Sequence, residues 1–169
     1  MTADEPALSE RFRGWDSYQE LLVSMARPLD SADRELRAAP HLRRLGDISA
    51  HIVAGHAWWF HTDLGEGRSA LMRYVRRDEP DRPPASATDL VTGLERTWAL
   101  LQDCLARWHP SDLDVTFERG DARFTRSWEI LHVLAHDMHH GGEMSLTLGL
   151  HGRPVPDLQR MDTACACHQ

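Results

Sequence analysis

Histidines recur at every fourth position within residues 128–147. The row comprises His132, His136, His140, Glu143 and Thr147. On an α-helix these five side chains fall within an arc of about 80°. Two histidines at i and i+4 can hold one metal ion, because their ring nitrogens converge over one turn. The spacing therefore predicts a metal site on one face of a helix.

Three histidines in line do not usually all reach one ion, so either His132 or His140 is expected to be a supporting or free residue. The segment is not a zincin protease motif, because that motif needs glutamate directly after the first histidine, and Val133 and Asp137 occupy those places. His140-x-x-Glu143 resembles half of a di-iron carboxylate site. Such a site is excluded, because it needs two Glu-x-x-His motifs and the sequence does not contain a pair of them.

A third ligand must come from another helix, and residues 47–63 offer candidates. His51 and His56 flank the apolar face of this segment on opposite sides, whereas His61 points away. Spacing alone does not choose between His51 and His56. Both remain candidates at this point.

The elements that must position these side chains are amphipathic and helical. The segments with helical periodicity are 7–27, 47–63, 88–108 and 127–150. Ser86 or Thr88 is expected to cap the third segment and Ser127 the fourth. Apolar and polar residues alternate within 110–125, with Leu113, Val115 and Phe117 among the apolar ones. This alternation predicts a short extended segment with a turn at 120–121. Four such helices with two long connectors predict an all-α four-helix bundle.

Length and composition limit the function classes. A chain of 169 residues is expected to be one domain, 1–169, with loose ends at 1–6 and about 159–169. A formal net charge of −7 disfavours nucleic acid or an anionic membrane as partner. There is no apolar run of membrane-spanning length and no signal-peptide pattern. All 19 basic residues are arginine, which excludes Schiff-base and P-loop lysines.

Cysteine usage indicates a reducing compartment, and we expect a cytoplasmic protein. The chain has 3 cysteines, an odd number without the pattern of a disulfide framework. Cys104 is expected to be a buried small hydrophobe. The sequence Cys165-Ala-Cys167-His168 offers a weak site for a soft metal, because it has no fourth ligand.

Two local signatures resemble the DinB family of predicted metalloenzymes, and the resemblance covers roughly residues 8–158. One is His51-Ile-Val-Ala-Gly-His-Ala-Trp, and the other is the His-x3-His-x3-His row followed by Gly141-Gly142-Glu143. The resemblance implies a DinB-type bundle with His51, His136 and His140 as ligands of a divalent metal. Many members have Glu or Arg where this chain has His56. In many family members the second signature ends in His-Arg-Gly-Gln, whereas this chain has His140-Gly141-Gly142-Glu143. Any role that the arginine plays in those members is therefore missing here.

The resemblance also suggests which reactions such a metal site could catalyse. Three neutral histidines leave an open coordination position, as in catalytic zinc sites. Some members of the wider superfamily use the thiols bacillithiol or mycothiol, which implies an S-transferase acting on small electrophiles. A hydrolase using activated water and a non-enzymatic binding or resistance protein are the alternatives, as is a bundle with a degenerate site. Zinc is the first expectation for the metal, with nickel, iron or manganese also compatible. A homodimer is expected by the same resemblance.

Supporting roles can be assigned to neighbouring residues. Glu143 could orient a ligand ring or act as a catalytic base, or it could be a surface residue. His56, His132 and Trp59 are candidates to line the pocket or support the ligands, although core packing is the favoured role for His132 and Trp59. Asp137 lies nearer the apolar arc and is expected to pair with a neighbouring helix.

Overall fold

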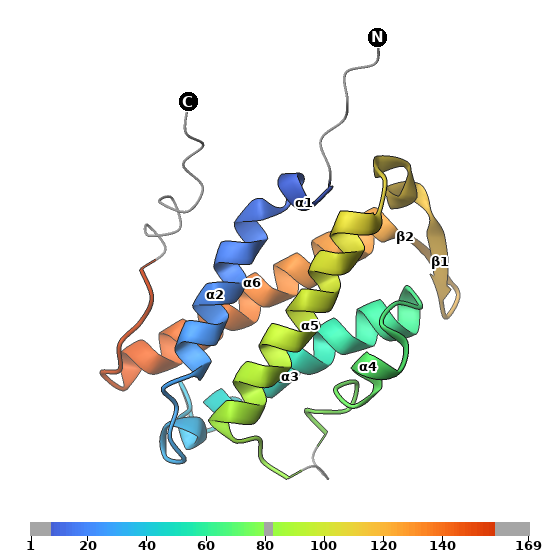
Figure 1. The fold of residues 1–169 in the computed structure, drawn as a ribbon. Coiled ribbons are helices and arrows are strands. Elements are labelled where there is room, and N and C mark those ends of the chain that lie inside the picture. The colour runs from blue at the N-terminus through green and yellow to red at the C-terminus, as the bar shows by residue number, and fades with distance from the viewer. Residues whose placement is uncertain (1–7, 80–82, 158–169) are drawn as a thin grey trace, which may run out of the picture.

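The computed structural model describes residues 8–79 and 83–157, and it is built mainly of helices (Figure 1). The long helices are α2 (Arg13–Ala26), α3 (Leu45–Trp58), α5 (Ala87–Arg107) and α6 (Arg126–Leu150). α2 packs on α5 and α6, and α3 packs on the same two helices. The predicted all-α four-helix bundle is confirmed. The Cys165–His168 segment lies outside the described residues, as do 1–6 and 159–169.

Short elements connect the bundle helices. They are α1 (Leu8–Arg11), α4 (Arg68–Met72), two 3₁₀ turns (Asp33–Glu35 and Pro110–Asp114), a π-helical turn (Trp59–Asp63) and the strands β1 (Thr116–Arg119) and β2 (Ala122–Thr125). β1 and β2 form the extended segment expected within 110–125. They pair antiparallel, and Gly120 takes a positive φ of 61° in the turn between them. α4 was not expected from the sequence.

The helix starts are set by capping groups. Of the two expected candidates, Ser86 caps α5. Its hydroxyl accepts a hydrogen bond from the Asp89 N–H at 3.1 Å, and the Asp89 carboxylate accepts one from the Ser86 N–H at 3.1 Å. The expected cap of α6 at Ser127 is wrong. Thr125 takes that role and accepts from the Trp128 N–H at 3.1 Å. Thr125 ends β2 with an extended backbone, which is the conformation that an N-cap requires.

One buried carboxylate connects the four long helices. Asp137 of α6 is fully buried, and its Oδ2 accepts from Trp15 Nε1 at 2.8 Å and from Gln19 Nε2, both on α2. Its Oδ1 accepts from Nε2 of His56 on α3 at 2.7 Å. The other ring nitrogen of His56 lies 2.9 Å from Thr97 Oγ1 on α5. Asp137 therefore pairs with neighbouring helices, in the direction that its position on the apolar arc suggested.

An apolar core surrounds this polar network. Its largest fully buried side chains include Leu22, Ile52, Phe60, Leu94, Leu101, Ile130 and Met144, drawn from all four long helices and the π-helical turn. Among residues 8–79 and 83–157, no helix combines the length and the hydropathy that crossing a bilayer would need.

α2 and α6 approach each other closely at Gly141 of α6. A Cβ atom built at Gly141 would lie 2.9 Å from Leu22 Cδ2 and would overlap Tyr18 Oη. Tyr18 is held in place by its hydrogen bond to the Met138 carbonyl at 3.2 Å. At the next residue, Gly142, a Cβ would meet no atom within 4 Å. The two glycines therefore form a matched pair for mutation.

We expect Gly141→Ala to lower the free energy of unfolding by about 1–2 kcal/mol, because crowding against α2 outweighs the better helix propensity of alanine. Gly142→Ala should instead raise it by up to about 1 kcal/mol. Urea unfolding of both variants in the presence of EDTA measures this difference without any contribution from bound metal. Equal stability of the two variants would show that α2 and α6 are not in close contact here.

Candidate metal centre

Three histidines from two helices form one cluster. His51 lies on α3, and His136 and His140 lie one turn apart on α6. One ring nitrogen from each lies within 4.8 Å of the others. The ring centroids are separated by 4.9 Å for His51–His136, 4.8 Å for His51–His140 and 4.3 Å for His136–His140. Small side-chain rotations would bring three nitrogens onto one ion, for which bonds of about 2.0–2.1 Å are typical.

A glycine on α3 makes room for the cluster. A Cβ atom at Gly55 would lie 2.9 Å from His136 Cε1 and 2.7 Å from Trp59 Cζ3. Real Cβ atoms do not approach other atoms this closely, so any larger residue would displace one of these rings. The small residue thus lets α3 and α6 approach closely enough for His136 to reach His51.

His136 is the member of the cluster in which neither ring nitrogen has a hydrogen-bond partner among the described residues. Both nitrogens are buried. Burial, followed by the proximity of His140 and His51, lowers the pKa of His136 to about 2. The ring is therefore neutral at pH 7, which is the form that binds metals. Buried polar atoms without partners are rare and costly, and a metal ion would satisfy one of these nitrogens.

The other two histidines are each held by a carboxylate. His51 Nδ1 lies 2.6 Å from Asp78 Oδ2, and His140 Nδ1 lies 2.6 Å from Glu143 Oε2. Since a carboxylate only accepts, each Nδ1 carries the proton and leaves Nε2 as an electron-pair donor. Metal-binding histidines commonly have such partners, which orient the ring and raise its basicity. Glu143 thus lies where it can orient His140.

Burial and the hydrogen-bonded partners shift the pKa values of His140 and Asp78. Burial lowers the pKa of His140, and its hydrogen bond to Glu143 only partly opposes that effect. For Asp78, burial raises the pKa, but the hydrogen bond from His51, together with a backbone hydrogen bond and nearby positive charge, holds the pKa below its usual value. Asp78 thus remains a carboxylate near neutral pH, and the burial of His140 favours the neutral imidazole that a metal needs.

Asp78 is a residue that sequence reasoning missed. It begins a charged, proline-rich stretch that follows α4, and nothing in its spacing relates it to His51, which precedes it by 27 residues. Glu143 was the carboxylate considered as a partner for a candidate ligand, and the chain contains 26 acidic residues. Only the tertiary structure selects among them.

Trp59 and His132 border the cluster. Trp59, the first residue of the π-helical turn, places its ring edge-on to His136 with 4.6 Å between centroids, and edge-on to His132 at 4.5 Å. His132 stacks on Trp128 at 4.8 Å and lies outside the three-histidine group. Of the three histidines in line on α6, His132 is therefore the one that does not join the cluster.

The structure also shows the surroundings of His56, His139 and Cys104. His56 does not line a pocket, because it is fully buried and bonded to Asp137 and Thr97. A second potential ligand group consists of His139, His140 and Glu143. It shares His140 with the three-histidine cluster and Glu143 with the His140 pair, and His139 is exposed.

Cys104 is buried as expected. Burial raises its pKa to about 12, so it is no thiolate nucleophile at neutral pH.

Comparisons with known proteins agree with this fold. The model of the DinB superfamily matches residues 13–144. Among solved structures, a crystal structure of a DinB-like protein from Bacillus cereus is similar, with a TM-score of 0.70 and 21% sequence identity. The match covers 87% of this chain and 94% of the other. At that identity the similarity concerns the fold alone. No curated protein matches the chain.

We expect Asp78→Asn to weaken zinc binding about 10-fold or more, because the neutral amide no longer raises the basicity of His51. Glu79→Gln is the matched control, since the neighbouring Glu79 pairs with Arg76. Competition against a chromophoric chelator measures both affinities. If the two variants bind zinc equally well, Asp78 does not support a metal ligand.

Proposed function

The chain belongs to the DinB superfamily, and on this premise we propose that it is a metal-dependent enzyme acting on small molecules. In this proposal His51, His136 and His140 hold one divalent ion, with zinc the first candidate. The reaction proposed is the transfer of a low-molecular-weight thiol to a small electrophile. One observation carries the proposal above the others. His136 keeps two buried nitrogens without partners, between two histidines whose Nδ1 atoms are already bonded.

The donor set suits zinc. Three neutral imidazoles with carboxylates behind two of them are the usual ligands and supports of catalytic zinc, and three protein ligands leave a position for a small molecule. Imidazole also binds nickel, iron and copper, so the metal in the cell depends on availability. When bound, a divalent ion would lower the pKa of a thiol at the open position and make a thiolate at neutral pH.

The chain's own residues have separate tasks in this reaction. Each of the three histidines would contribute one ring nitrogen to the ion, and Asp78 and Glu143 hold the Nδ1 protons of His51 and His140. Trp59 packs nearly perpendicular to the ring of His136 and would help to fix its orientation. We assign Glu143 a positioning role, because its Oε2 is engaged with His140.

The proposed bond changes are those of a nucleophilic substitution. The thiolate sulfur forms a bond to the electrophilic carbon, and the leaving group departs with the electron pair of the broken bond. The thiol proton is released to solvent. Hydrolysis would use water in place of the thiol, so the dependence of turnover on thiol separates the two reactions.

Metal content is the first test. We expect about one zinc or other divalent ion per chain in the wild type after untagged purification, and little in His136→Ala. His139→Ala should retain the metal, because His139 is a neighbouring but exposed histidine, with 68% of its side chain accessible. Elemental mass spectrometry measures all three proteins. A wild-type protein that stays metal-free after incubation with zinc or nickel would refute the proposed metal centre.

Turnover is the second test. The zinc-loaded wild type should conjugate a chromogenic aryl halide with at least one thiol from a panel of small cysteine-containing thiols, and His136→Ala should reduce the rate about 100-fold or more. His139→Ala should retain activity. Thiol-independent ester hydrolysis would instead support a hydrolase. A protein that holds the metal but turns over neither substrate type would point to a binding protein.

A further inference from the structure

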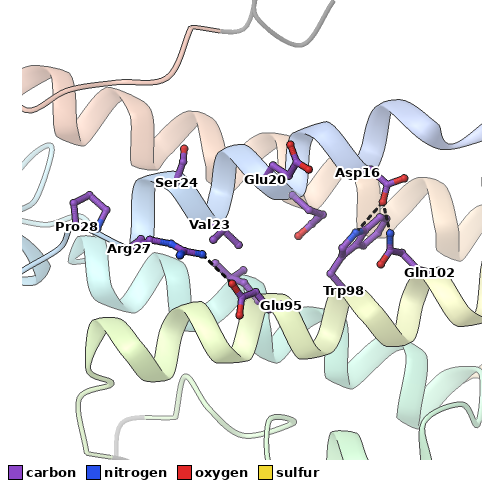
Figure 2. A pocket seen from close by; sticks show the side chains of 11 residues that line it. Asp16, Glu20, Val23, Ser24, Arg27, Pro28, Glu95, Trp98 and Gln102 are labelled. Carbon is purple, nitrogen blue, oxygen red and sulfur yellow. Dashed lines mark hydrogen bonds and ion pairs between the residues drawn. The ribbon is translucent and has the colours of Figure 1, made fainter. Parts of the chain in front are cut away.

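A cavity lies between α2 and α5, and none of the three clustered histidines lines it. This groove has a volume of about 990 Å³ and is open along one side of the bundle (Figure 2). Asp16, Glu20 and Val23 of α2 lie on one side, and Glu95 and Trp98 of α5 lie on the other. The metal proposal uses none of these residues.

The charges in the groove are mainly negative. Its lining includes the carboxylates Asp16, Glu20 and Glu95 and one basic residue, Arg27. Arg27 is already paired with Glu95 at 3.0 Å, at one end of the groove (Figure 2). The uncompensated charge is therefore concentrated on Asp16 and Glu20.

Asp16 and Glu20 lie one helical turn apart on α2. Like charges at this spacing repel each other and destabilise a helix by a few tenths of a kcal/mol. Asp16 Oδ1 accepts from Trp98 Nε1 at 3.0 Å and from Gln102 Nε2, and both of these donors are neutral. Within the described parts of the chain, no ion pair of Glu20 is found. A cation placed between the two carboxylates would relieve the repulsion.

A buried acceptor at the wall of the groove also lacks a donor. Gln19 lines the groove with only 2% of its surface exposed. Its Nε2 donates to Asp137, and its Oε1 has no hydrogen-bond partner among the described residues. The bond to Asp137 fixes the orientation of the amide, so Gln19 can use Oε1 only to accept. The wall of the groove thus holds one buried acceptor without a donor.

The rest of the lining is apolar and aromatic. Val23, Leu94 and Trp98 contribute to the walls. Trp98 is 9% exposed and is supported from behind by Trp15, with 5.0 Å between the ring centroids. Indole rings attract ammonium ions when these lie within about 6 Å of the ring. The apolar and aromatic walls favour an organic cation over a hydrated metal ion, because they can bury an apolar chain and attract an ammonium group.

We propose that the groove between α2 and α5 binds a small organic ammonium ion that carries an apolar chain. The ammonium group lies between Asp16 and Glu20, and the chain lies along Val23, Leu94 and Trp98. Charge complementarity favours this cation over carboxylates and phosphates of similar size. This ligand site is independent of the proposed metal centre and would remain if no metal is bound.

Hexylammonium is a suitable probe, with hexanol and hexanoate as neutral and anionic analogues of equal chain length. NMR titration of the full-length protein, followed at the indole N–H of Trp98, reports binding at the groove, and a Trp98→Phe spectrum assigns the signal. We expect hexylammonium to bind about tenfold more tightly than hexanol, and hexanoate not to bind. Glu20→Gln should weaken the binding of hexylammonium about fivefold.

Three further proteins make the test decisive. Asp16→Asn combined with Glu20→Gln should abolish the preference for hexylammonium over hexanol. Asp121→Asn removes one charge from the distant turn between β1 and β2, and it should leave binding unchanged. His136→Ala should also bind hexylammonium normally, because the amine does not need the histidine cluster. Equal affinities for hexylammonium and hexanol, an unaffected double variant, or loss of binding in His136→Ala would each overturn the proposal.

Discussion

The burial of the Asp137 carboxylate is the constraint on which the rest of the bundle depends. A charge without access to water is tolerated only when its oxygens receive several hydrogen bonds, and removing one partner of such a group typically costs about 3–5 kcal/mol. Here the donors come from α2 and α3, and His56 extends the network to Thr97 on α5. These bonds are directional, whereas the apolar contacts around them would allow a helix to rotate. The network therefore determines which face of α6 points into the bundle.

The rotation of α6 in turn positions the candidate metal centre. His136 precedes Asp137 by one residue, so with Asp137 in the core the row of His136 and His140 faces α3. The same applies to α3. His51 and His56 are five residues apart, about 140° around the helix, so while His56 reaches Asp137, His51 faces a different side and meets the cluster. One helix pair thus supports two histidine environments, the buried network of Asp137 and the three-histidine cluster.

Sequence reasoning reached those features that local periodicity carries. The helices of the bundle and the row on α6 follow from spacing within single segments, and so does the inward direction of Asp137. The choice between His51 and His56 depends on which helix each side meets, and spacing left it open until a family resemblance favoured His51. The pairing of Asp78 with His51 could not be predicted for the same reason, since the two residues lie on different elements. The cap of α6 was assigned to Ser127 instead of Thr125, because the extended segment predicted within 110–125 had no defined end. The strand that precedes α6 gives Thr125 the backbone conformation of an N-cap.

The contrast between two neighbouring residues is the strongest argument that the histidine cluster has a chemical role. At Asp137 both carboxylate oxygens are satisfied by donors from two helices. At His136, one residue earlier, two buried nitrogens have no partner in the described structure, although this ring too could have met a serine, a threonine or a carboxylate. Stability alone would favour such a partner, or an apolar side chain of similar size. Departures from local consistency are expected mainly at functional sites. The arrangement at His136 is therefore best explained by a ligand that the protein chain itself does not provide.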